Sequence, residues 1–188
     1  MVQNTNQKKD NFSRNIFDQM ILAIDVYYIV DTAKAVGVLF DWKDQTPQQV
    51  LTAHLNGIEG YVPGEFYKRE LPCLLEIIEQ VDISTLAAIL VDGHVYISEM
   101  EYGLGGKLYE ILNQKIPIIG VAKNSFHANR TTVKEVYRGE SSKPLYVSAI
   151  GIDLDEVTES IKAMKGAFRM PDILKKLDNY TKLAAFDI

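Results

Sequence analysis

Apolar residues in the first third of the chain form short runs that have the length of strands. Ile21 to Val30 is a dense apolar run, and a turn over Asp31 to Ala33 separates it from a second run, Lys34 to Phe40. Gln48 to Leu55 continues the series as a third strand. Short apolar runs divided by turn residues are typical of hairpins. After a polar arm and short helix over residues 1–20, the chain is therefore predicted to begin with an antiparallel meander.

The pattern changes in the middle of the chain. Phe66 to Val81 has apolar positions at helical spacing, whereas Leu86 to Val91 is continuously apolar, as in strands that are covered on both faces. Residues 103–112 again predict a helix, which leads into a buried strand over residues 116–122. A strand, a helix and a strand in this order predict a parallel pair of strands with a right-handed crossover.

The last third of the chain adds two strands and two helices. Strands are predicted at residues 132–136 and 144–150, and helices at 155–165 and 171–183. Antiparallel hairpins followed by β-α-β units, with helices for both faces, predict a mixed α/β sheet of the RNase H-like type. Because a chain of 188 residues can bury its apolar side chains in a single core, we expect one domain over residues 21–188.

Composition narrows the class of protein. Apolar residues make up 47% of the chain and charged residues 24%, which is typical of a globular protein. No apolar run reaches the ~18–20 residues of a membrane span, and the polar start lacks a secretory signal, so we expect a cytoplasmic protein without membrane contact. The single cysteine, Cys73, excludes an internal disulfide and a thiolate zinc site, and we expect its thiol to be buried.

The formal net charge of −5 argues against a broad basic surface for nucleic acid. It does not exclude a local site, because bound divalent cations reverse the field around a cluster of carboxylates.

Three carboxylates stand where such a cluster is expected. Asp25 interrupts an apolar strand, Asp92 ends a buried strand just before Gly93, and Glu70 lies near the start of a predicted helix. Each has a plainer interpretation, namely a paired structural aspartate, a loop cap and an exposed helix glutamate. Together they suit Mg²⁺ or Mn²⁺, which take oxygen ligands, and two such ions can promote phosphodiester cleavage.

Segments of the chain resemble the endonuclease V family. The strongest is Tyr61-Val-Pro-Gly-Glu-Phe-Tyr-Lys-Arg-Glu-Leu-Pro72, and Leu90-Val-Asp-Gly-His94 and Ile119-Gly-Val-Ala-Lys123 follow in the family's order. Ala23-Ile-Asp-Val-Tyr-Tyr28 is similar to the family's first strand. The resemblance extends from about Ile21 to Lys123.

The resemblance implies an RNase H-like endonuclease that binds Mg²⁺ or Mn²⁺. Such an enzyme cuts DNA or RNA at the second phosphodiester bond on the 3′ side of a deaminated purine, above all hypoxanthine. Carried over by position, the metal ligands would be Asp25, Glu70 and Asp92, and Lys123 would contact the scissile phosphate. Tyr61, Val62 and Pro63 would form a wedge that separates strands at the lesion. Further substrate contacts would come from Gly64, Gly93 and His94.

The chain departs from the family in two places near this site. The histidine that the family carries after its last core strand is missing from Val147 to Asp153, so Asp153 or Asp155 could supply an oxygen ligand instead. Val95 replaces a glycine that would let a flipped base approach the backbone. Two alternatives therefore stay open: a catalytically weak protein that binds nucleic acid or a nucleotide, and a scaffold for protein contacts.

Overall fold

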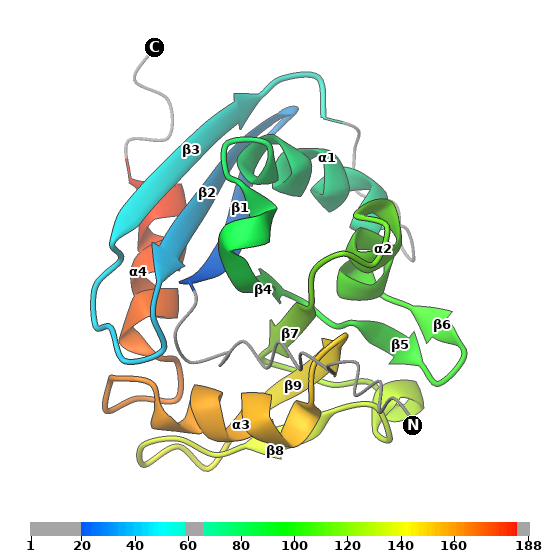
Figure 1. Cartoon of the computed structure of the whole chain (residues 1–188), viewed down its shortest axis with the longest axis vertical. Coiled ribbons are helices and arrows are strands. Elements are labelled where there is room, and N and C mark those ends of the chain that lie inside the picture. The colour runs from blue at the N-terminus through cyan, green and yellow to red at the C-terminus, as the bar shows by residue number, and fades with distance from the viewer. Residues whose placement is uncertain (1–19, 59–65, 184–188) are drawn as a thin grey trace, which may run out of the picture.

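The computed structural model describes residues 20–58 and 66–183, and its centre is a seven-stranded mixed sheet with the order β3-β2-β1-β4-β7-β9-β8 (Figure 1). The strands are β1 (Met20–Ile29), β2 (Thr32–Phe40), β3 (Gln49–Leu55), β4 (Leu86–Asp92), β7 (Ile118–Ala122), β8 (Lys134–Val136) and β9 (Leu145–Ile150). Strands β1, β4 and β7 are parallel to one another, and the other neighbours pair antiparallel. The predicted mixed α/β sheet, with its meander and its parallel units, is confirmed.

Four α-helices in the described residues connect or follow these strands. They are α1 (Phe66–Ile78), α2 (Leu104–Ile111), α3 (Leu154–Ala163) and α4 (Asp172–Lys182). Two 3₁₀ turns, η2 (Ile83–Thr85) and η3 (His127–Asn129), and a small hairpin of β5 (Tyr96–Ser98) and β6 (Glu101–Tyr102) complete the elements. The hairpin was not predicted, because strands of two or three residues are too short to show a period.

The helices cover the sheet from both sides, with α1 and α2 on one face and α3 and α4 on the other (Figure 1). Successive side chains of β1 point to opposite faces of the sheet and so contribute to both cores. Leu22 and Ile24 pack under α1 and α2, whereas Ile21 and Ala23 pack under α3 and α4. All four are buried, and burial becomes partial from Asp25 onward. The strand therefore leaves the core at its aspartate.

Several boundaries differ from the sequence-based prediction for identifiable reasons. Helix α1 ends at Ile78 because its last turn tightens, with Gln80 N–H donating to the carbonyl of Ile77. Strand β7 starts at Ile118, since Pro117 has no N–H to donate to a neighbouring strand. The polar arm predicted for residues 1–20 lies almost entirely outside the described residues. In the described part of the chain, no helix combines the length and apolarity that crossing a membrane requires.

Candidate active site

The carboxyl ends of the three parallel strands bring charged residues to one edge of the sheet. In register, Ile24 of β1 pairs with Val91 of β4, so Asp25 and Asp92 each follow one member of this pair. Lys123 comes directly after β7, whose Val121 pairs with Asp92. Ligands of open α/β sheets gather at this edge, because the loops that leave parallel strands meet there.

Glu70 reaches the same edge from α1 and is buried, with 6% of its surface exposed. The Tyr28 hydroxyl donates a hydrogen bond to the carbonyl of the neighbouring Arg69 at 3.2 Å, and the Arg69 guanidinium lies 3.5 Å from the centre of the Tyr28 ring. Glu70 is therefore not an exposed helix glutamate. It lines a pocket of about 190 Å³ together with Asp25 and Asp92.

The pKa values of these carboxylates are raised by burial and, for Asp25 and Glu70, by repulsion from the neighbouring carboxylates. Burial raises the pKa of Asp25 to about 6, with a further contribution from Asp92. Burial also raises the pKa of Glu70 to about 8, where the charge of Asp25 outweighs the opposing charge of Arg69. The pKa of Asp92 is raised mainly by loss of hydration, although its side chain opens onto the pocket, and Lys123 opposes this shift.

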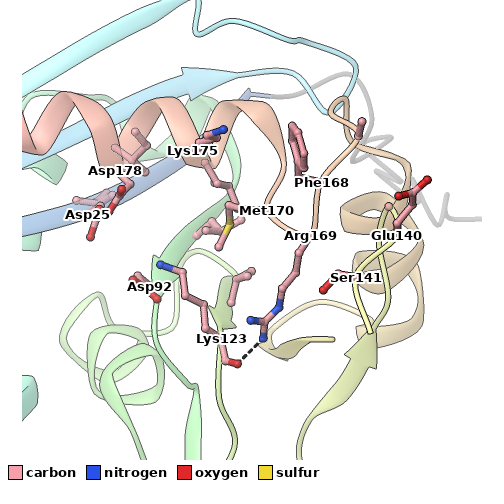
Figure 2. Close-up of a pocket in the computed structure, with 17 residues that line it drawn as sticks. Asp25, Asp92, Lys123, Glu140, Ser141, Phe168, Arg169, Met170, Lys175 and Asp178 are labelled. Carbon is pink, nitrogen blue, oxygen red and sulfur yellow. Dashed lines mark hydrogen bonds between the residues drawn. The ribbon is translucent and has the colours of Figure 1, made fainter. Parts of the chain in front are cut away.

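A fourth carboxylate, Asp178, comes from helix α4 and was not predicted. It raises the pKa of both Asp25 and Asp92, and it lines a larger pocket of about 970 Å³ with them and with Lys123 (Figure 2). Asp178 also forms an ion pair with Lys182 at 2.7 Å. A polar residue on an amphipathic helix normally indicates a solvent face. The feature of the sequence that could have indicated Asp178 is its position directly after Leu177, at the border of the buried face of α4.

A divalent cation fits this site by its donor atoms. Within residues 20–58 and 66–183, no three His, Cys, Asp or Glu side chains are already close enough together to hold a metal ion. Carboxylate oxygens are nevertheless the ligands that Mg²⁺ and Mn²⁺ favour. A cation bound between these carboxylates would offset their mutual repulsion. Metal binding would therefore require Asp25, Glu70, Asp92 and Asp178 to draw closer together.

The residues after Asp92 turn away from both pockets. His94 is buried, its Nε2 lies 2.8 Å from the carbonyl oxygen of Asn124, and its ring centre lies 5.3 Å from that of Phe126. Its Nδ1 finds no partner among the described residues. Val95 is fully buried, and its side chain packs against Gly105 of α2. Val95 therefore lies in the core and is not among the residues that line either pocket.

Asp153, which the sequence offered for a fourth ligand, lies away from both pockets. Asp153 is the N-cap of α3, where its carboxylate accepts hydrogen bonds from the N–H groups of Asp155 and Glu156 at 2.8 and 3.0 Å, and it lines neither pocket. The expected wedge, Tyr61, Val62 and Pro63, and Gly64 with it, lie outside the described residues. Asp178, by contrast, lines the larger pocket.

Glu70→Gln is expected to stabilise the protein at alkaline pH in the presence of EDTA. The pKa of Glu70 is about 8 in the folded chain and lies near its ordinary value of 4.5 in the unfolded chain. The folded state therefore binds the extra proton, and wild-type stability falls as pH rises between these two values. At pH 9 the free energy of unfolding of the variant in urea should exceed that of wild type by on the order of 2 kcal/mol, and at pH 4 the two proteins should be equally stable. An equal difference at both pH values would contradict a titrating Glu70.

Comparisons with known proteins agree with this geometry. The chain matches the family model of endonuclease V over residues 2–140. Human endonuclease V superposes with a TM-score of 0.70 at 20% identity, covering 87% of this chain and 83% of the human chain. The Bacillus subtilis endonuclease V gives a TM-score of 0.75 at 17% identity, with 89% and 81% covered.

A third solved structure holds nucleic acid. Ciona intestinalis endonuclease V, in complex with a 24mer DNA that contains an inosine followed by a ribo-adenosine, superposes with a TM-score of 0.72 at 16% identity over 87% of this chain and 84% of that chain. No curated protein sequence matches this chain. At these identities the solved structures establish the shared fold, and the family model covers most of the sequence. The chain therefore belongs to the endonuclease V family.

Proposed function

We propose that this protein is a metal-dependent endonuclease that hydrolyses a phosphodiester bond on the 3′ side of a deaminated purine, hypoxanthine above all, in DNA or RNA. The observation that carries the proposal is the gathering of four carboxylates with Lys123 at the edge where β1 stops pairing with β4 and where β4 and β7 end. The Lys123 ammonium among several carboxylates suits a phosphate that is also held by a cation. Family membership, and the inosine in the Ciona complex, support the choice of substrate.

The residues of the site would divide the chemistry among them. Asp25, Glu70, Asp92 and Asp178 would hold Mg²⁺ or Mn²⁺, which when bound stabilises negative charge on a phosphate and its leaving oxygen. The Lys123 ammonium faces the pocket and would orient the scissile phosphate.

A second candidate function is binding of nucleic acid or a nucleotide with little cleavage. Two observations favour it: the family histidine is missing from the chain, and the carboxylates of the described residues are not yet arranged as a metal site. Binding without hydrolysis would still use Lys123 and the large pocket.

Cleavage of matched oligonucleotides separates these two functions. A labelled single strand with one inosine, as DNA and as RNA, is incubated with excess protein and Mg²⁺ or Mn²⁺, beside the same strand with adenosine and beside an EDTA control. We expect one product, cut on the 3′ side of inosine, only when the metal is present. An Asp92→Asn preparation controls for contaminating nucleases.

The outcomes are distinct. Binding of the inosine strand by fluorescence anisotropy without any cut, at enzyme excess and in both metals, would support the second function. Neither binding nor cleavage of DNA or RNA would contradict both functions.

A further inference from the structure

The larger pocket continues well beyond the carboxylates. Its floor is apolar and consists of Ile24, Leu90, Val121, Met170, Leu174 and Leu177. Asp25 and Asp178 lie at one end, and Phe168 and Glu140 lie at the other (Figure 2). A volume of about 970 Å³ is large for a phosphate and its metal, since pockets of ~300–1,000 Å³ accommodate whole organic ligands. The apolar part of the pocket therefore has room for a further ligand group next to the charged end.

Phe168 is an exposed aromatic residue at the rim of this pocket, with 65% of its surface accessible. It lies in the segment between α3 and α4, and this segment is firmly held. The guanidinium of Arg138, which is itself buried, donates to the carbonyl of Phe168 at 2.9 Å and to that of Arg169 at 3.3 Å. Gly139 passes so close beneath that a Cβ atom there would lie 3.2 Å from the Cα of Phe168. An aromatic ring on so well-fixed a segment is pre-arranged for contact with a partner.

Positive side chains connect this ring with the charged end of the pocket. The ammonium of Lys175 lies 5.0 Å from the centre of the Phe168 ring, and most of the surface of Phe168 is exposed. Arg169 donates hydrogen bonds to the carbonyls of Lys123 and Pro144. The segment that carries Phe168 is thus bonded directly to the backbone of the lysine beside the acidic cluster (Figure 2).

We propose that Phe168 is the stacking platform for an unpaired base of the strand that is cut, and that Lys175 faces the phosphate of that nucleotide. This inference rests on the proposed function, because it places the strand across the acidic cluster. A nucleotide combines a flat apolar base with a negative phosphate, and the pocket offers an aromatic ring beside an ammonium. Every base has a π-face, so the subsite is expected to tolerate any base.

Phe168→Ala tests the platform in an Asp92→Asn background, which keeps the oligonucleotide intact. Loss of one stacked base should weaken binding of a single strand about 5- to 100-fold, at every salt concentration.

Lys175→Gln should instead reduce the slope of log affinity against log salt by about 0.7, because one phosphate contact is lost. Phe168→Tyr should retain the affinity. With 2-aminopurine placed at one position after another, a single position should be quenched in the parent protein and not in Phe168→Ala.

Tyr137→Ala is the matched control, because Tyr137 is an aromatic residue exposed by 53% that lines a different pocket. It should bind as tightly as the parent. Unchanged affinity and unchanged 2-aminopurine quenching in Phe168→Ala, with wild type still cutting in Mg²⁺, would overturn the platform and leave the nuclease function standing. Wild type that neither binds nor cuts any strand would overturn both.

Discussion

Asp178→Asn is expected to lower the rate of oligonucleotide cleavage about 100-fold or more without unfolding the protein. Asp178 lines the pocket between Asp25, Asp92 and Lys123 and contributes to the pKa shifts of both aspartates. As a direct metal ligand, Asp178 should matter more for the cleavage rate than residues that only hydrogen-bond to metal ligands. Loss of such residues usually costs 10- to 100-fold in metal affinity or activity. Its partner Lys182 is exposed, so breaking that ion pair should change stability by less than ~1 kcal/mol. Single-turnover cleavage and thermal melting measure the two effects.

Asp155→Asn is the matched control for this experiment. Asp155 is an exposed aspartate that pairs with Lys134 and lines a different pocket, and the sequence had offered it, beside Asp153, for the fourth place in the site. We expect the control to cut like wild type. A large loss in Asp155→Asn together with a small loss in Asp178→Asn would reverse the assignment.

Arg138→Ala is expected to reduce the free energy of unfolding by about 3–5 kcal/mol, a large fraction of the 5–15 kcal/mol that is typical of a domain. The side chain is 5% exposed, and it donates hydrogen bonds to the carbonyls of Lys162, Met164, Gly166, Phe168 and Arg169. These carbonyls belong to the end of α3 and the segment that leads to α4. Truncation would leave buried acceptors without a donor, and urea unfolding monitored by circular dichroism measures the loss.

Two further variants show whether the hydrogen-bond geometry of Arg138 is responsible. Arg130→Ala removes an exposed arginine and should change stability by no more than about 0.5 kcal/mol. Arg138→Lys keeps the charge but has no planar fork, so it should recover only part of the stability. Full recovery with lysine would mean that charge alone matters. Loss of affinity for a single strand in Arg138→Lys would follow from a loosened Phe168.

Local sequence pattern was enough to identify most elements of the fold. Dense apolar runs predicted β1, β4 and β7, and helical spacing predicted α1, because both periods are properties of the neighbouring residues. The same pattern put Asp25 and Asp92 in strands whose carboxyl ends meet at one edge. Their approach therefore followed from the order of elements. The wedge of Tyr61, Val62 and Pro63 and the neighbouring contact at Gly64 remain predictions from resemblance.

What only the tertiary structure decided depends on packing between distant segments. Glu70 is buried because α1 packs against β1 and β2, and its raised pKa follows mainly from that burial. Asp178 lines the pocket because α4 packs across β1. The sequence of a helix does not by itself show which strand the helix will pack against. Val95 is buried because α2 packs over it, which its position in the sequence motif did not reveal. Periodicity specifies an element and its buried face, whereas the site depends on how the elements pack together.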